Sequence, residues 1–338
     1  MINQISCEEL RCAVVAQSSR GLRHSAKWIA ELYVEVSRYQ KNAGISTAST
    51  TKNSFMRFGT SMDEDIPEML MAKTYFDLGE YNRAAFVLRD CTNIQHASSP
   101  SPSSFNQKAF FLRGYARYLQ GEKEKDQLIA EAVDPLERCK IANEQLQPLQ
   151  EELAPIYKQG NLDAFGIYLY AMVLNALKAT DEAREALIQA VNAYPYIWSA
   201  WVDLALLCRN KADLGALRGD LQDHWMKMFF ATHALIELRV QDDAIKTCLA
   251  LMQTIPCTHG KAQLAMARYN AQKYDAAEQL FNEVFEGDPY RLDSLDSFSN
   301  ILFVKADSAR LSRLAHRAVT IDKFVVCFCL RETTSSHS

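Results

Sequence analysis

The sequence lacks the short motifs that mark common catalytic sites. It has no glycine-rich phosphate loop, no HExxH pair of metal ligands and no GxSxG nucleophile turn. The acidic run at 63–65 lacks the glycine and the spaced ligands of a calcium loop, so we interpret it as a solvated linker segment. None of the seven histidines pairs with a cysteine at metal-ligand spacing. We therefore predict no catalytic residue, no bound metal and no cofactor.

Long apolar runs and a strong excess of one charge are lacking as well. The longest uninterrupted apolar run covers 167–174, whereas a membrane-spanning helix needs roughly 20 residues. The net charge is -4, and no basic face emerges along the predicted helices, which argues against nucleic acid as a partner. The first residues, MINQISCEELR, are polar and acidic, so we expect no signal peptide. Neither a membrane nor a nucleic acid is a predicted partner.

The cysteines do not form a recognisable metal or disulfide pattern. Nine are scattered along the chain without the pair of pairs typical of a zinc site. Several fall at predicted helix core positions, which favours reduced thiols. We expect a protein of the nucleus and cytoplasm.

The chain does contain an internal repeat, which is clearest at 264–289. Two apolar stripes at the spacing of a helix face flank a short polar turn around Gln272. The small residues Ala265 and Ala277 fall where two antiparallel helices must approach closely. Six residues match the intervals of a tetratricopeptide repeat (TPR): Leu264, Ala265, Tyr274, Ala277, Phe281 and Pro289.

Further copies of this pattern predict the fold. Small, large and proline residues recur in the same register at 183–195 and 244–256, and Pro256 precedes Pro289 by 33 residues, close to the roughly 34 of a TPR. One TPR hairpin cannot bury its own apolar face, so the copies must stack. We predict an all-α TPR superhelix, a solenoid of helix-turn-helix hairpins. Its last five repeats are expected at 163–195, 196–223, 224–256, 257–289 and 290–322.

The predicted organisation has four parts. A helical lead-in at 1–40 is followed by a flexible linker at 41–66, the TPR array at 67–322 and a divergent apolar/polar tail at 323–338. We expect the tail to be the unstable end, because its apolar run 324–330 has no polar face and cannot cap an array. Packing of that run as a short helix on the last repeat is the alternative.

Two segments interrupt the predicted array. The first, at 93–107, is a polar loop with two Ser-Pro pairs, interpreted either as a flexible insertion or as a proline-directed kinase site at Ser99 and Ser101. The second, at 127–161, is longer than a TPR turn. Its apolar spacing predicts an extra amphipathic helix through Leu146, Leu149, Leu153 and Ile156. Just before it, GEKEKD at 121–126 is interpreted as a solvated turn between helices.

Several strings in order along the chain resemble one family in particular. They are RGLRHSAKWIAEL (20–32), AKTYFDLGEYNRAA (72–85), DAFGIYLYAMVL (163–174), DHWMKMFFATHALIEL (223–238), DPYRLDSLDSFSNILFV (288–304) and LSRLAHRAVTIDK (311–323). They resemble the N-terminal half of subunit eight of the anaphase-promoting complex, the cell-division-cycle-twenty-three type. The Ser-Pro insertion is longer than the family's usual connection. The family's groove for the activator subunit lies in later repeats, so no residue here is assigned that role.

The resemblance implies a non-catalytic scaffold subunit of a ubiquitin ligase that drives mitotic exit. It also implies a homodimer formed through the N-terminal repeats, stacked on other TPR and scaffold subunits of the complex. The aromatic residues of this region supply the candidate dimer and partner contacts, although most must be core: Trp28, Tyr33, Tyr75, Phe76 and Tyr81, with Phe86 nearby. For Trp28, packing within an entry helix is the alternative interpretation.

Two other functional classes compete with the scaffold. A co-chaperone-like TPR adaptor would need Lys and Arg repeated on the first helices of neighbouring hairpins to bind a terminal carboxylate, but those helices carry mostly Tyr, Met, Ala and Leu. An enzyme would need a nucleophile and a base, and the sequence supplies no such pair. The pattern favours an interaction scaffold.

Overall fold

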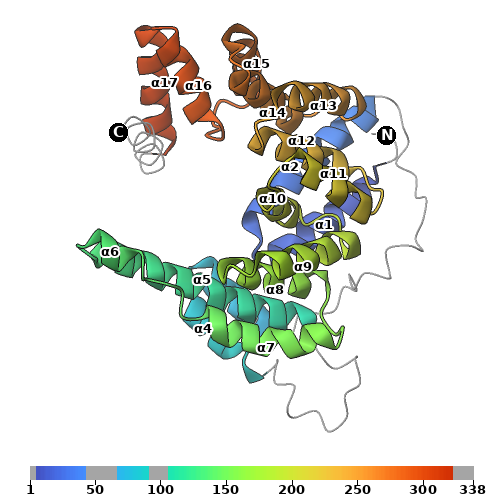
Figure 1. Cartoon of the computed structure of the whole chain (residues 1–338), viewed down its shortest axis with the longest axis vertical. Helices are drawn as coiled ribbons and strands as arrows, with labels where there is room; N and C mark the ends of the chain where they lie inside the picture. Colours follow the sequence, from blue (N-terminus) through green and yellow to red (C-terminus); the bar gives the residue numbers. More distant parts are fainter. Residues whose placement is uncertain (1–4, 43–66, 91–105, 323–338) are drawn as a thin grey trace. The chain divides into compact units, whose positions relative to one another are not determined.

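The computed structural model describes residues 5–42, 67–90 and 106–322 (Figure 1). In these ranges the chain forms seventeen α-helices and no β-strand, which confirms the all-α prediction for this part of the sequence. The predicted linker at 41–66 and the Ser-Pro loop at 93–107 lie almost entirely outside the described residues, and the predicted tail at 323–338 lies wholly outside them.

The chain divides into two compact units. Within the described ranges, the N-terminal unit consists of residues 5–42, 67–90, 106–207 and 217–224, and the C-terminal unit consists of residues 208–216 and 225–322. The helices of the N-terminal unit are α1 (Cys7–Ser19), α2 (Arg23–Asn42), α3 (Pro67–Asp77), α4 (Tyr81–Val87), α5 (Gln107–Glu131), α6 (Pro135–Arg138), α7 (Leu146–Lys158), α8 (Ala164–Ala176), α9 (Thr180–Ala193) and α10 (Trp198–Leu206). Helix α11 (Lys211–Asp220) is divided between the units. The C-terminal unit continues with α12 (Met226–Glu237), α13 (Gln241–Thr254), α14 (Thr258–Asn270), α15 (Tyr274–Gly287), α16 (Leu295–Val304) and α17 (Ser308–Ile321).

Most hairpins of the described ranges turn through a residue in the left-handed backbone region. In the α14–α15 hairpin that residue is Gln272, with φ 58°. Its N–H donates to the carbonyl of Tyr269 and the N–H of Lys273 donates to the carbonyl of Arg268, both at 2.9 Å. This pair of bonds satisfies the last carbonyls of the first helix and reverses the chain. The equivalent turn residues are Gly79, Gly160, Lys178, Arg239 and Ala306.

The packing of the C-terminal unit follows the repeat. First helices contact first helices, α12 with α14 and α14 with α16, and each second helix contacts the first helix of the next hairpin. Ala265 and Ala277 are fully buried, which confirms the predicted close approach of α14 and α15. Phe281 and Phe285 of α15 then pack against Phe298 of α16, with ring centroids 5.8 and 5.4 Å apart. Apolar burial of this kind is what joins one hairpin to the next.

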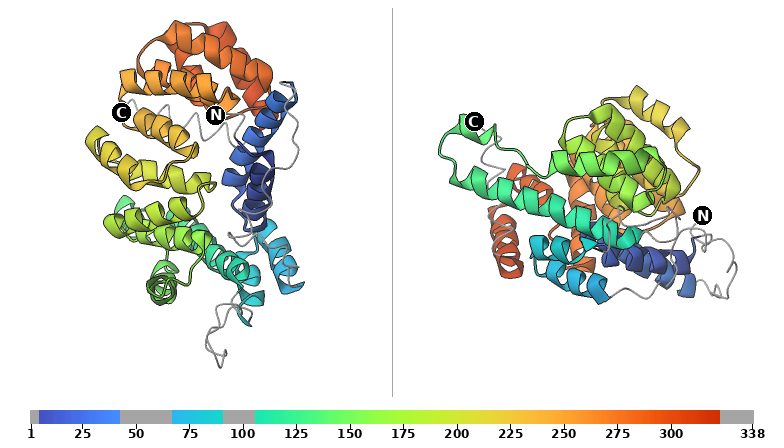
Figure 2. Two further views of the ribbon diagram at one scale, coloured as in Figure 1. Left: turned by 90° about the vertical axis from the view of Figure 1, so that its right-hand side faces the viewer. Right: turned by 90° about the horizontal axis from the view of Figure 1, so that it is seen from below.

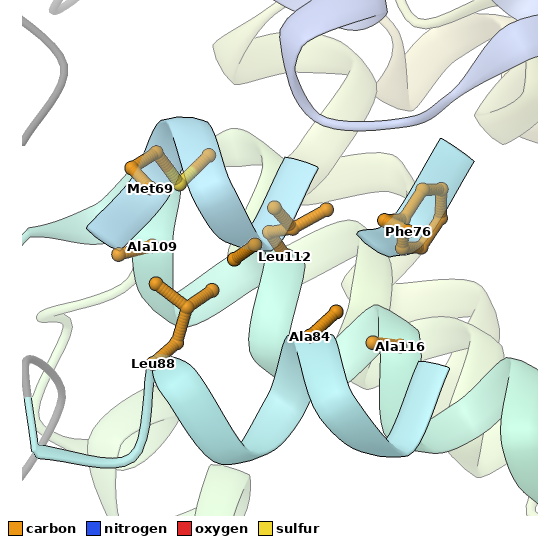
Figure 3. Packing of buried hydrophobic residues seen from close by; sticks show 8 residues of the cluster. Met69, Phe76, Ala84, Leu88, Ala109, Leu112 and Ala116 are labelled. Carbon is orange, nitrogen blue, oxygen red and sulfur yellow. The ribbon is translucent and has the colours of Figure 1, made fainter. Parts of the chain in front are cut away.

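The first hairpin of the N-terminal unit builds its core in the same way. Met69 and Phe76 of α3 meet Ala84 of α4 and Leu88 at its C-terminal end, and α5 closes the cluster with Leu112 (Figure 3). The alanines in this cluster leave room for the large side chains of the neighbouring helix. The cluster therefore ties the first hairpin to α5.

The predicted extra helix is present as α7, and all four of its predicted apolar residues are buried. Interpreting 121–126 as a turn was wrong, because these residues lie inside α5. A Cβ atom at Gly121 would lie 1.8 Å from the amide oxygen of Asn143. The glycine therefore serves to admit the Asn143 side chain against the helix and does not break it.

Candidate interaction surfaces

The turn between α1 and α2 fastens the N-terminal hairpin to α8. The guanidinium of Arg20 lies 4.0 Å from the ring centroid of Phe165 and donates to a carboxylate oxygen of Asp163 at 3.3 Å. The other carboxylate oxygen of Asp163 accepts from the N–H of Gly166 at 2.7 Å and so caps α8. Because Arg20 is almost fully buried, its charge is compensated by the carboxylate and by the face of the ring.

The same turn also contacts the end of α3. Gly21 has φ 80°, and a Cβ atom there would lie 2.4 Å from the ring of Phe76. Arg23 donates to the carboxylate of Asp77 at 2.9 Å and to its carbonyl at 3.2 Å. Burial acts to raise the pKa of Asp77, but hydrogen bonds from Lys73 and Arg23 outweigh it, and the pKa is lowered. We call Arg20, Gly21 and Arg23 the clasp.

Farther along, the hairpin packs on the segment that opens α10. The indole rings of Trp28 and Trp198 stack with centroids 4.4 Å apart and planes 10° from parallel. The side-chain amide of Gln17 donates to the carbonyl of Tyr196 at 2.9 Å, and the Tyr196 hydroxyl donates to Glu9 at 2.8 Å. These contacts join residues separated by up to 187 positions in the sequence. The lead-in hairpin is therefore built into the N-terminal unit.

The predicted contact residues occupy different environments. Trp28 and Phe76 are buried within their own unit, Trp28 against Trp198 and Phe76 against Tyr81 and Tyr115. Tyr33, Tyr75 and Tyr81 are half-buried. The guanidinium of Arg83 lies 4.1 Å from the Tyr75 ring centroid and donates to its hydroxyl at 3.1 Å. The role of these five residues in binding a partner stays a prediction, and Tyr33, Tyr75 and Tyr81 have side-chain surface left for it.

A group of aliphatic residues missed by sequence reasoning is more exposed. Leu70, Met71 and Leu78, together with Phe86, expose between 45 and 75% of their surface on the α3–α4 hairpin. We call these four residues the first-repeat face. In a stacked array such positions normally contact the preceding hairpin, and α3–α4 is the first hairpin of the TPR array. The position of this hairpin at the start of the array was the signal that could have identified them.

The buried titratable groups do not form a catalytic arrangement. Tyr168 donates to the carboxylate of Asp203 at 2.9 Å, and burial raises the pKa of Asp203. In the C-terminal unit, burial, with contributions from Arg291 and His233, lowers the pKa of His259 to about 3. In both groups burial disfavours the charged form, and the contacts around them serve packing. Within the described ranges no cluster of His, Cys, Asp and Glu has the geometry of a metal site.

Two further predictions concern modification and membranes. Ser99 and Ser101 lie outside the described residues, so phosphorylation there stays a prediction. Among the described helices, none has the length and the apolar character needed to cross a bilayer.

Stacked antiparallel helix pairs in this register define a helical repeat protein of the tetratricopeptide type. A family model, anaphase promoting complex subunit 8 / Cdc23, matches residues 6–282. Anaphase-promoting complex subunit 8 of Arabidopsis thaliana is 33% identical and aligns with 96% of this chain and 58% of its own length. The cell division cycle protein 23 homologs of Mus musculus and Homo sapiens are each 35% identical, over 89% of this chain and 47% of theirs. The chain belongs to the anaphase-promoting complex subunit 8 / Cdc23 family, and it spans about half the length of these relatives.

Proposed function

We propose that this chain is a non-catalytic TPR scaffold subunit of the anaphase-promoting complex, a ubiquitin ligase of the cell cycle and mitotic exit. It works in the nucleus and cytoplasm, forms a homodimer through its N-terminal repeats and stacks on other TPR and scaffold subunits. Membership of the subunit 8 / Cdc23 family is the observation that carries this proposal. The names of the relatives support a place in the complex.

The first-repeat face supports the dimer. Met71 and Phe86 are large apolar side chains that expose 45 and 61% of their surface in the isolated chain. Because about half of each side chain is left to bury, each one would stabilise the dimer by about 1–1.5 kcal/mol before the cost of association is subtracted. Hydrogen bonds and ion pairs hold the neighbouring Lys73 and Arg83 within the same hairpin. The guanidinium of Arg89 lies 4.1 Å from the Phe86 ring centroid, so the other face of that ring is the one offered to a partner.

The dimer is tested by sedimentation of the full chain at tens of micromolar. We expect wild type to sediment as a dimer and the double variant Met71→Ser, Phe86→Ser to sediment as a monomer with unchanged helix content. The matched control is Leu249→Ser, Tyr290→Ser, which removes one exposed aliphatic and one exposed aromatic residue of the C-terminal unit. A monomeric wild type would contradict dimerisation through the first-repeat face. So would a dimer that is lost in the control variant but kept in the Met71→Ser, Phe86→Ser variant.

Membership of the complex is tested separately. The tagged full chain is purified from the cells that encode it, and the companion proteins are identified by mass spectrometry. We expect cullin-like and RING subunits of the ligase among them. Their absence, with the chain intact and soluble, would contradict the scaffold role and leave the dimer result standing.

A further inference from the structure

Helix α5 continues well beyond the core that supports it. Its buried residues end at Gly121, yet the helix continues for ten more residues to Glu131. No residue between 122 and 142 is buried, and α6 lies in this segment (Figure 1, Figure 2). We call residues 122–142 the arm. At about 1.5 Å per residue, the helical part alone extends about 15 Å past Gly121.

The base of the arm is fixed by one buried side chain. The Asn143 amide donates to the carbonyl of Tyr118 at 3.1 Å and to the carboxylate of Glu122 at 3.0 Å. Its oxygen accepts from the N–H of Gln145 at 2.9 Å. Asn143 thereby ties the returning chain to α5 at the point where Gly121 leaves space. The arm is thus an anchored projection, so its tip has a defined position relative to α5.

The tip is also ordered by its own hydrogen bonds. Asp134 caps α6 by accepting from the N–H of Leu136 at 3.0 Å. The guanidinium of Arg138 donates to the carbonyl of Ala132 at 2.9 Å, across the turn between α5 and α6. These bonds hold a bent two-helix tip without any apolar core beneath it. Ordered structure of this kind presents its side chains in one arrangement.

The tip combines apolar side chains with an excess of negative charge. Leu128, Val133 and Leu136 expose 48, 89 and 71% of their surface. Residues 126–138 contain four carboxylates and one basic residue, Arg138, whose guanidinium donates to the carbonyl of Ala132. The carboxylates are Asp126, Glu131, Asp134 and Glu137. In the described part of the chain, Asp126, Glu131 and Glu137 have no basic partner.

We propose that the arm is a docking element that inserts Leu128, Val133 and Leu136 into an apolar groove bordered by Lys and Arg on another protein subunit. The proposal rests on the proposed membership of the anaphase-promoting complex. Unpaired carboxylates around the tip favour a basic rim and repel the phosphates of nucleic acid and of anionic lipid. The exposed apolar residues of the same segment supply the area that is removed from water on binding.

The test compares complexes rebuilt by co-expressing the full chain with the other subunits of the complex from the same organism. One variant, Leu128→Ser, Leu136→Ser, removes the apolar part of the tip, and a second, Asp126→Lys, Glu131→Lys, Glu137→Lys, reverses its charge. The control is Leu249→Ser, Tyr290→Ser in the C-terminal unit. Because the tip contributes no core residue, both arm variants should keep the helix content and the melting temperature of wild type.

We expect each arm variant to lower the recovery of the same neighbouring subunit by about tenfold or more, and the control to leave it unchanged. Wild-type recovery of every subunit with both arm variants overturns the docking proposal and leaves scaffold membership intact. Failure of the wild-type chain to recover any subunit overturns both. Binding of the wild type to phosphatidylserine vesicles or duplex DNA, lost in the first arm variant, would overturn the choice of a protein partner.

Discussion

The two units of this chain differ in the contacts that stabilise each unit internally. In the C-terminal unit, packing passes from each hairpin to its neighbour, as from Phe281 of α15 to Phe298 of α16. In the N-terminal unit, the α1–α2 hairpin also contacts α3, α8 and α10 through the clasp and the Trp28–Trp198 stack. In the C-terminal unit, stability is approximately the sum of the interface energies between neighbouring hairpins. In the N-terminal unit, contacts also join residues that are distant in the sequence. A local change should therefore spread further in the N-terminal unit.

The largest effect is expected from Trp28→Ala. The substitution removes a large buried side chain together with its stacking contact with Trp198. This loss should destabilise the N-terminal unit by about 3–5 kcal/mol. Hydrogen exchange measured on the full chain should show faster exchange in α1, α2 and α10 together. Helix α10 is far from α1 and α2 in sequence, and this contact links it to α2.

Phe281→Ala is the matched change in the C-terminal unit. It should cost a similar free energy of unfolding, about 3–5 kcal/mol, but accelerate exchange mainly in α14, α15 and α16. If Trp28→Ala affected only its own helix, or if Phe281→Ala affected the whole unit, the contrast between the units would be wrong.

The clasp gives the next largest effect. Gly21→Ala places a Cβ atom into the Phe76 ring and imposes a left-handed backbone on a residue that disfavours it, so we expect a loss of about 3 kcal/mol. Gly79→Ala has nearly the same φ, 77°, but no atom within 4 Å of the new Cβ, and should cost only about 1 kcal/mol. Denaturant unfolding of both variants checks the difference. Equal losses would mean that the contact with Phe76 contributes nothing.

Acid should weaken the C-terminal unit by an intermediate amount. The pKa of buried His259 is lowered to about 3 from an ordinary value of 6.5, chiefly by burial and then by Arg291 and His233. Below pH 6.5 the unfolded chain therefore binds a proton that the folded chain does not, and stability falls as pH falls. The slope is about 1.4 kcal/mol per pH unit, or about 2 kcal/mol at pH 5.

In the N-terminal unit two groups shift the acid dependence of stability in opposite directions. Burial lowers the pKa of His224 to about 4, whereas burial raises the pKa of Asp203, so the folded state gains a proton on Asp203 as pH falls. Hydrogen exchange at pH 7 and pH 5, corrected for intrinsic rates, compares the units. His259→Gln should reduce the pH dependence of the C-terminal unit, and the remainder is expected from His233, whose pKa burial also lowers. If the pH dependence of the C-terminal unit were unchanged in His259→Gln, a titratable group other than His259 would cause it.

How far the fold could be predicted from the sequence follows the same division. The repeat predicted at 257–289 contains α14 and α15 and their turn at Gln272, because every contact that defines it lies within one period. The clasp depends on pairs such as Arg20 with Asp163, which are 143 positions apart, and no local pattern indicates them. Gly121 misled the prediction for the same reason, since its partner Asn143 lies beyond the end of α5.

The candidate surfaces were predictable only in part. Aromatic composition indicated the first hairpin and α2, but it did not separate buried Phe76 and Trp28 from the half-buried Tyr33, Tyr75 and Tyr81. The first-repeat face exists because the α3–α4 hairpin has no preceding hairpin of the array. The arm exists because α5 continues beyond its last buried residue. Both are properties of the assembled unit. A single period of the sequence contains neither.

The smallest expected effect concerns a feature that both units share, a hairpin turn with a left-handed residue that is not glycine. Lys178 in the N-terminal unit and Gln272 in the C-terminal unit turn their hairpins with φ 64° and 58°, and both side chains are exposed. A Cβ atom is disfavoured by about 1–2 kcal/mol in this region, while glycine loses about 0.5–1 kcal/mol more backbone entropy on folding. Lys178→Gly and Gln272→Gly should therefore each stabilise the chain by about 1 kcal/mol or less. Thermal unfolding monitored by circular dichroism would register a small rise in midpoint, equal for the two variants because the turn involves only its own hairpin. A clearly larger gain in one unit would mean that long-range contacts strain its turns, and that the units differ even at this local level.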